Sequence, residues 1–197
     1  MEKHKKENKT IICLRKIKMV RMVTITISGT PGSGKSTVAM LLEKKLGIKY
    51  VYSGMLFREL AEKHHMSLED FGKYCEKNPD IDKELDAQQL KILQKGDVIL
   101  EGRLAGWLAY RNNISALKIM IDADINTRAE RIVKREKGDV KTRKQEIIKR
   151  EKSEILRYKK YYDIDLRDKS IYDLVINTGD KTPESIVNMI IKEIKSK

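Results

Sequence analysis

Short apolar runs along the chain alternate with longer segments in which apolar residues recur every three or four positions. The apolar runs are rich in β-branched residues and are typical of buried strands; they cover residues 23–27, 48–52, 98–100, 117–121 and 173–177. The periodic segments predict helices over residues 35–46, 53 to about 64, 67–95 with a break near Asn78-Pro79, 126–137, and 139 to about 162, with a last helix opened by Pro183. This alternation predicts an α/β fold in three layers, with a mainly parallel sheet that binds ligands at the carboxyl ends of its strands.

The strongest motif directly follows the first strand and opens the first helix. It reads Gly29, Thr30, Pro31, Gly32, Ser33, Gly34, Lys35, Ser36, Thr37. Its glycines let the backbone approach an anion, and the helix that follows directs unpaired N–H groups and its positive dipole end at that anion. Lys35 supplies a charge for the outer phosphates, and the Ser36 hydroxyl can bind Mg²⁺. The motif predicts a P-loop that binds a nucleoside triphosphate.

Composition narrows the class of protein. The 197 residues suit one domain, and no apolar stretch reaches the ~20 residues needed to cross a bilayer. Cys13 and Cys75 lie far apart and form no C-x-x-C pair, which favours a reducing compartment without disulfides or structural zinc. We therefore expect a cytoplasmic protein without a membrane partner.

The formal net charge of +13 is concentrated in two segments. Residues 1–22 carry a net charge of +6 and residues 128–160 carry +8, whereas the remainder sums to −1. A nucleic-acid footprint would form a basic stripe with aromatic platforms, so a small polyanionic substrate explains the late cluster better. Residues 1–22 carry no recognisable catalytic or binding motif. We interpret them as a disordered basic extension or as the result of an early start codon. The functional domain then spans residues 23–197.

Polar residues follow the second and third strands, at the edge of the sheet where the P-loop lies. Ser53 is expected to cap the helix that begins there, and Arg58 lies on that helix. Glu101 and Arg103 follow the third strand. Glu101 can hold Mg²⁺ through water, and the two arginines can bind one acceptor phosphate through their planar guanidinium groups. The alternative for each arginine is a surface ion pair.

Arginines also mark the late basic segment. Arg131 and Arg135 lie four residues apart on one helix face, and Arg143 and Arg150 lie beyond the break at Gly138. Two such arms can neutralise a phosphoryl group in transfer and exclude water. A solvated pair of charged helices is the alternative, which we accept for most of the lysines there.

The chain resembles nucleoside-monophosphate kinases, and most specifically the archaeal-type cytidylate kinases. The resemblance covers residues 23–197 and is carried by GTPGSGKST at 29–37, SGMLFREL at 53–60, LEGRLAGW at 100–107, IDADINTRAERIVKRE at 121–136 and YDLVINT at 172–178. It implies phosphoryl transfer from ATP to CMP, and to dCMP, with Mg²⁺. It also implies a helical acceptor-binding insert at about 53–95 and a short lid at about 136–150.

The same resemblance implies roles for individual residues. Ser53, Arg58 and Arg103 match acceptor-site positions, and Arg143 and Arg150 are similar to lid arginines. Of Arg131 and Arg135, one would stack on adenine and the other would contact phosphates. With Lys35, these four late arginines form the predicted catalytic set, while Ser36 and Glu101 form the predicted metal site. We expect the protein to act as a monomer on nucleotides.

Two departures from related families bear on the acceptor. Adenylate kinases usually carry G-K-G-T in the loop and D-G-[FY]-P-R after the third strand, whereas this chain has Gly34-Lys35-Ser36-Thr37 and Glu101-Gly102-Arg103-Leu104-Ala105. Bacterial cytidylate kinases have a longer insert and a base-reading Asp and Arg; Asp163, Asp165 and Arg167 are the candidates here. Another small-molecule kinase of this fold, such as an adenylate or uridylate kinase, and a P-loop RNA-associated ATPase stay open. A GTPase is disfavoured because the chain has no N-K-x-D motif.

Overall fold

A computed structural model describes residues 23–67, 70–71, 74–75 and 78–196 of the chain. The strands are β1 (Ile25–Gly29), β2 (Lys49–Tyr52), β3 (Val98–Glu101), β4 (Leu117–Asp122) and β5 (Leu174–Asn177). The helices are α2 (Lys35–Leu46), α3 (Ser53–Lys63), α5 (Pro79–Lys95), α6 (Ala105–Arg111), α7 (Ile125–Glu136), α8 (Val140–Tyr162) and α9 (Pro183–Ser196). The predicted extension, residues 1–22, lies outside the described residues.

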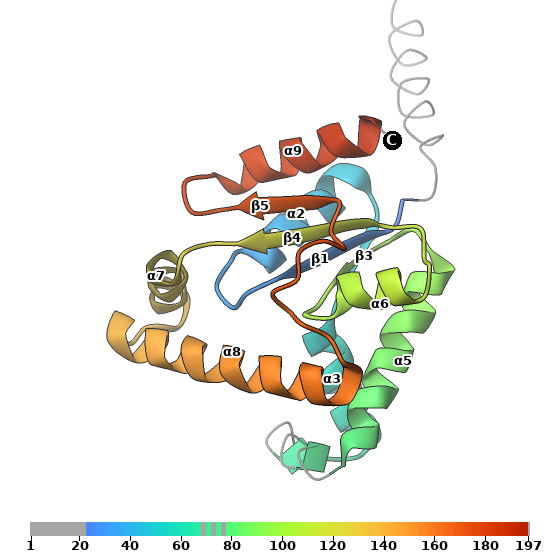
Figure 1. Ribbon diagram of the computed structural model, residues 1–197, viewed down its shortest axis with the longest axis vertical. Coiled ribbons are helices and arrows are strands. Elements are labelled where there is room, and N and C mark those ends of the chain that lie inside the picture. The colour runs from blue at the N-terminus through green and yellow to red at the C-terminus, as the bar shows by residue number, and fades with distance from the viewer. Residues whose placement is uncertain (1–22, 68–69, 72–73, 76–77, 197) are drawn as a thin grey trace, which may run out of the picture.

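The strands form one parallel sheet in the order β2-β3-β1-β4-β5, with β1 at its centre (Figure 1). All five strands therefore end at the same edge, which is where the P-loop leaves β1. This arrangement confirms the predicted α/β fold with a parallel sheet and places the residues that follow β1, β3 and β4 next to one another.

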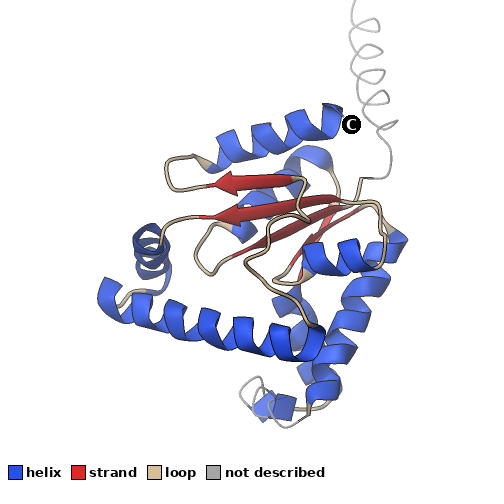
Figure 2. Cartoon of the chain, viewed as in Figure 1, coloured by secondary structure: helices blue, strands red, loops and turns tan. Residues whose placement is uncertain are grey.

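Helices cover both faces of the sheet (Figure 2). On one face α2 and α9 pack against Ile25 and Ile27 of β1, which are fully buried. On the other face α5 and α6 pack against Val98 and Leu100 of β3. Alternate residues of each strand point to opposite faces, so both layers need apolar side chains from the same short runs. None of the helices in the described part of the chain is both long and apolar enough to span a membrane.

Two local features differ from the sequence prediction. Ser53 is not the N-cap of α3: it is the first helical residue, Tyr52 is the N-cap, and no side chain caps this end. The Ser53 hydroxyl instead donates to Gln89 Oε1 at 2.9 Å and to the Glu101 carbonyl oxygen at 3.1 Å. Helix α6 was not predicted, because its seven residues are nearly all apolar and show no helical period.

Helices α7 and α8 reach over the carboxyl edge of the sheet and are joined by a tight turn. Asp124 caps α7 by accepting from the backbone N–H groups of Asn126 and Thr127, and Asp139 caps α8 by accepting from that of Thr142. Between the helices Gly138 has a φ of 98°, a left-handed conformation that favours glycine. These caps and this turn fix the direction in which the late arginines point.

Candidate active site

The P-loop wraps the start of α2 and is fixed from below by close backbone packing. Gly34 caps α2 with a φ of 93°, and a Cβ on Gly29 would lie 2.1 Å from the Ile121 carbonyl oxygen of β4. The Ser33 hydroxyl and the Lys35 ammonium both donate to the Thr30 carbonyl oxygen at 2.8 Å. The Thr30 hydroxyl in turn donates to Asp122 Oδ1 at 2.5 Å. The loop is therefore ordered by its own contacts, as an anion-binding loop requires.

Lys35 is the most strongly perturbed cation of the site. Burial and the nearby Arg103 guanidinium lower its pKa to about 8, against the opposing effect of the Glu101 carboxylate. At this pKa the loss of solvent and the neighbouring guanidinium outweigh the carboxylates that stabilise the ammonium. A phosphate group placed beside Lys35 would supply that stabilisation.

Glu101 lies beside the P-loop helix and has a partner for each carboxylate oxygen. The Ser36 hydroxyl donates to Oε1 at 3.1 Å, and the Tyr50 hydroxyl of β2 donates to Oε2. Burial and the Glu101 carboxylate raise the pKa of Tyr50 above its usual value, so the hydroxyl stays a donor. The structure thus brings together the hydroxyl and the carboxylate that the sequence predicts for the metal site.

A hard cation that is bound mainly by phosphate oxygens needs few protein ligands. Mg²⁺ in nucleotide sites usually takes one or two oxygen ligands from the protein and completes its shell with phosphates and water. Ser36 and Glu101 provide this kind of donor set. Within the described ranges, no group of three or more His, Cys, Asp or Glu side chains could hold a metal ion by itself.

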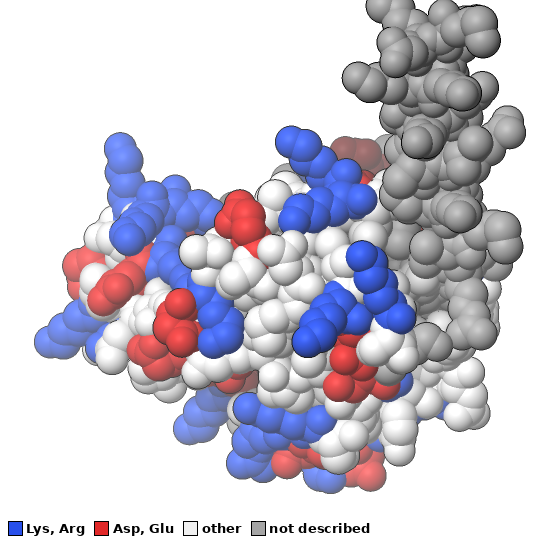
Figure 3. Space-filling model, turned by 90° about the horizontal axis from the view of Figure 1, so that it is seen from above, with Lys and Arg blue, Asp and Glu red and all other residues white. Residues whose placement is uncertain are grey.

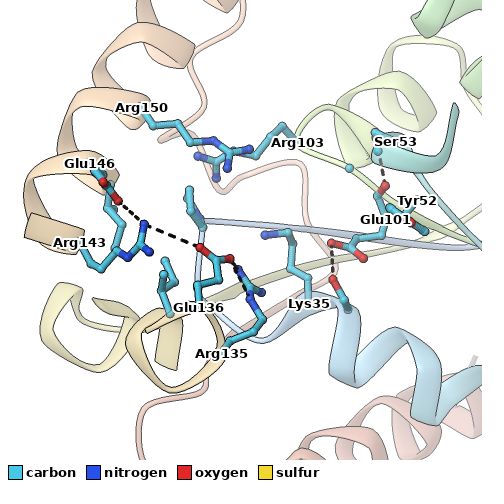
Figure 4. A pocket seen from close by; sticks show the side chains of 17 residues that line it. Lys35, Tyr52, Ser53, Glu101, Arg103, Arg135, Glu136, Arg143, Glu146 and Arg150 are labelled. Carbon is cyan, nitrogen blue, oxygen red and sulfur yellow. Dashed lines mark hydrogen bonds and ion pairs between the residues drawn. The ribbon is translucent and has the colours of Figure 1, made fainter. Parts of the chain in front are cut away.

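A cavity of about 400 Å³ opens between the P-loop, the ends of β2 and β3, and helix α8. Its described lining includes five cations and three carboxylates, namely Lys35, Arg103, Arg135, Arg143, Arg150, Glu101, Glu136 and Glu146. In Figure 4, Lys35 rises from the floor while Arg103 and Arg150 point toward one another from opposite walls. The excess of positive charge suits a ligand with several negative charges. We call this space the first cavity.

The guanidinium groups around the first cavity are held by carboxylates. Arg103 Nε donates to Glu154 Oε2 at 2.6 Å, and Arg150 Nε donates to Glu154 Oε1 at 2.8 Å. Burial acts to raise the pKa of Glu154, but the two guanidinium groups outweigh it, and the pKa lies below its usual value. Glu154 therefore ties α8 to the end of β3.

The two remaining arginines of this cavity have exposed acidic partners. Arg143 Nη1 donates to Glu146 at 2.8 Å, and Arg135 Nε donates to Glu136 at 3.0 Å (Figure 4). Such exposed pairs are weak and exchange readily for a phosphate. We call the four residues Arg103, Arg135, Arg143 and Arg150 the arginine cover.

A second cavity, of about 420 Å³, lies on the other side of the P-loop. Arg131 faces it and is fixed by Thr178, whose carbonyl oxygen accepts from Arg131 Nη2 at 2.7 Å and whose hydroxyl accepts from Nη1 at 2.9 Å. Pro183 and Ile186 supply apolar surface to the same wall. The two cavities share Gly32, Lys35, Ser36, Ile132 and Arg135. Two ligands bound in them would therefore meet at Lys35.

Some predicted residues lie away from these two cavities. Arg58 is exposed; it donates to the Tyr52 hydroxyl and its guanidinium carbon lies 5.7 Å from the centre of the Tyr52 ring. Tyr52 lines the first cavity, so the Tyr52 side chain lies between Arg58 and that cavity. Asp165 and Arg167 pair with each other at 3.0 Å, and Asp163 ends α8. Arg167 lines a separate cavity of about 300 Å³, which Arg103 also reaches.

Four residues of the site were missed by the sequence reasoning: Tyr50, Asp122, Glu154 and Thr178. Two of them carried a visible signal. Asp122 ends a strand next to β1, and Glu154 follows Arg150 by four residues on one helix, a spacing that favours an ion pair. Tyr50 carried no such signal, because only the pairing of β2 with β3 brings it to Glu101. Thr178 likewise depends on the position of β5.

The face of the molecule seen in Figure 3 does not present a continuous basic stripe. Its lysines and arginines occur in groups beside acidic residues and are separated by uncharged surface. This mixed pattern differs from the stripe expected of a nucleic-acid interface.

These features together define a P-loop kinase. The sheet is parallel and has this strand order, the P-loop lies at the centre of its carboxyl edge, and two polar cavities meet at the loop lysine. A family model described as "Cytidylate kinase-like family" matches residues 24–180. The chain belongs to this family.

Curated relatives agree with that assignment. The chain is 43% identical to the cytidylate kinase of Pyrococcus horikoshii over 85% of this chain and 86% of the relative. It is 44% identical to the cytidylate kinase of Methanocaldococcus jannaschii, over 86% and 96% of the two chains, and 48% identical to that of Methanopyrus kandleri, over 80% and 85%.

Solved structures share the fold at lower identity. A shikimate kinase from Bacteroides thetaiotaomicron superposes with a TM-score of 0.61 at 14% identity, over 89% of this chain and 99% of that chain. An uncharacterized protein from Eubacterium ventriosum superposes with a TM-score of 0.68 at 23% identity, with the same coverage. These likenesses support the architecture alone.

Proposed function

We propose that this protein transfers the γ-phosphoryl group of ATP to CMP, and also to dCMP, to give ADP and the cytidine diphosphate. The observation that carries the proposal is the meeting of two polar cavities at one partly buried lysine, Lys35, in a chain of the cytidylate kinase-like family. Such a site brings a donor and an acceptor phosphate together. It needs no covalent enzyme intermediate.

The second cavity is suited to the donor. The guanidinium plane of Arg131, already fixed by Thr178, offers a flat surface for a base, and Pro183 offers an apolar one. From there the triphosphate would follow the P-loop toward Lys35. Backbone N–H groups at the start of α2 and the Lys35 ammonium would then neutralise its outer phosphates.

The first cavity is suited to the acceptor monophosphate. Ser53 and Gly102 line its wall, and Arg103 and Arg150 face its centre. The acceptor phosphate would displace Glu154 from these two guanidinium groups and Glu146 from Arg143, because a phosphate dianion is a stronger partner for arginine. An acceptor oxygen could then attack the γ-phosphorus in line, while the arginine cover stabilises the spread negative charge and excludes water.

Ser36 and Glu101 would hold the Mg²⁺ that accompanies ATP. When bound, the ion would supply positive charge that neutralises the phosphates of ATP. In this proposal the protein acts as a monomer. A cytoplasmic location, where ATP and nucleoside monophosphates are available, fits this chemistry.

A panel of acceptors tests the proposal. Formation of ADP from ATP and Mg²⁺ would be followed with CMP, dCMP, UMP and AMP, each at several concentrations. We expect CMP to give the highest kcat/KM, with dCMP next. A clear preference for AMP or UMP would replace the proposed acceptor. ATP hydrolysis without any acceptor activity, accompanied by salt-dependent RNA binding, would favour an RNA-associated ATPase instead.

A further inference from the structure

The hydroxyl of Tyr50 is the one part of the metal site that does not come from the edge residues expected to bind nucleotide. Tyr50 lies in the middle of β2, and β2 pairs with β3 so that Tyr52 stands opposite Glu101. From this position the Tyr50 hydroxyl reaches over to Glu101 Oε2. Glu101 Oε1 faces the Ser36 hydroxyl at 3.1 Å. The carboxylate is thus held at both oxygens, from two different elements.

The surroundings of Glu101 explain why its carboxylate needs a second hydrogen bond, from Tyr50, besides the one from Ser36. The carboxylate lies close enough to the Lys35 ammonium to perturb it electrostatically, and Arg103 lies in the same cavity. A carboxylate free to rotate would turn toward these cations and form an ion pair with them. An ion pair of this kind would remove Glu101 from Ser36 and occupy the charge that Lys35 offers to phosphate.

We propose that Tyr50 is a positioning residue for nucleotide-bound Mg²⁺, which keeps the Glu101 carboxylate turned toward Ser36 and away from Lys35. The assignment rests on the proposed function, because that function supplies the nucleotide-bound cation. Hydrogen-bonded residues behind a metal ligand commonly set its orientation and its affinity.

The ring of Tyr50 has a separate role, which makes the hydroxyl testable by itself. It stacks on Tyr52 with the ring centres 5.8 Å apart and an angle of 27° between the planes. It also packs against the core below α2. A phenylalanine at this position keeps the ring and loses only the hydroxyl, so the Tyr50→Phe protein should fold, with a modest loss of thermal stability because the buried Glu101 carboxylate loses one hydrogen bond.

Binding of Mn²⁺ in the presence of ADP, measured by electron paramagnetic resonance, tests the assignment without any turnover. We expect the Tyr50→Phe protein to bind Mn²⁺ about tenfold more weakly than the unaltered protein. Tyr161→Phe is the matched control, because Tyr161 is half-exposed near the end of α8 and contacts Lys160. Its Mn²⁺ affinity should stay within about twofold, the usual range for a surface substitution.

A double-substitution cycle separates positioning from a general structural effect. Glu101→Gln should weaken Mn²⁺ binding by itself, and Tyr50→Phe should then add less than about twofold, because both act through one carboxylate. Unchanged Mn²⁺ affinity in Tyr50→Phe, full additivity with Glu101→Gln, or loss of the folded state in Tyr50→Phe would each overturn the assignment. CMP is absent from this experiment, so failure of the proposed acceptor leaves its outcome unaffected.

Discussion

The P-loop and the arginine cover bind the same phosphates in our account, but they are stabilised in opposite ways. The loop is formed by backbone groups and by short contacts among Thr30, Ser33 and Lys35, which are neighbours in the chain. The cover is formed by long side chains from α7, α8 and the segment after β3, each paired with a glutamate. The loop is therefore preorganised, whereas the cover must exchange one anionic partner for another when the acceptor arrives.

Removal of the Lys35 charge should have the largest effect. Lys35→Ala should lower kcat by about 100-fold or more, because the ammonium stabilises charge that develops during transfer and no other buried cation of the loop can replace it. Steady-state kinetics with ATP and CMP measure this. Lys44→Ala, on the exposed side of the same helix, is the control and should be close to normal. Comparable activity of the two variants would mean that the loop is not the catalytic centre.

Removal of Arg103 should weaken binding of the acceptor CMP without weakening binding of ATP. Arg103→Ala should raise the KM for CMP by about 10- to 100-fold, since a charge-assisted bidentate contact contributes roughly 1.5–3 kcal/mol, and should leave the KM for ATP nearly unchanged. The proposed contact exists before transfer, so binding is affected more than turnover. An unchanged KM for CMP would refute the assignment of Arg103 to the acceptor.

Glu154 allows a test of the cover in the absence of substrate. Glu154 is 8% exposed and its carboxylate bonds two guanidinium groups, so Glu154→Gln should lower the free energy of unfolding by about 2 kcal/mol. Urea denaturation measures this. Glu146→Gln is the matched control: its side chain is 54% exposed, and loss of its pair with Arg143 should cost less than about 0.5 kcal/mol. Equal effects would show that the Glu154 tie does not hold α8 to the core.

The pH dependence of nucleotide binding should show the smallest effect of the four. The pKa of Lys35 is lowered to about 8, so the empty protein loses this charge as the pH rises above 8. Bound phosphate favours the charged form, and ADP affinity should therefore fall by about tenfold from pH 7 to pH 9. Calorimetric titration at pH 7, 8 and 9 checks this. In Lys35→Met the affinity should be low and nearly independent of pH over this interval; an equally steep fall would assign the titration to another group.

The same contrast explains how much the sequence could predict. The P-loop was predicted residue by residue because its motif is contiguous and each residue type answers a local requirement. The alternation of strands and helices predicted the parallel sheet but not the order of its strands, which the fold supplies. The arginines were placed on the correct elements because of the same alternation. Their partners depend on contacts between distant segments, such as Arg103 with Glu154 and Tyr50 with Glu101, 51 residues apart in each case.

The prediction that Ser53 is the N-cap of α3 was wrong for a related reason. Serine before a helix favours an N-cap locally, but Gln89 and the end of β3 offer its hydroxyl better partners in the folded chain. Tertiary contacts of this kind cannot be read from one segment. They also decide the position of Arg58, which the sequence placed at the acceptor and which lies behind Tyr52 in the fold.

Phosphoryl transfer from ATP to CMP can be followed through the phosphorus atom itself. ATP labelled with ³²P at the γ-position would be mixed with Mg²⁺, CMP and the protein, and the labelled products would be separated. We predict that the label appears in CDP, with little inorganic phosphate, and that Lys35→Ala slows this transfer by about 100-fold or more. Label that appears only as inorganic phosphate, or that stays in ATP, would contradict the account.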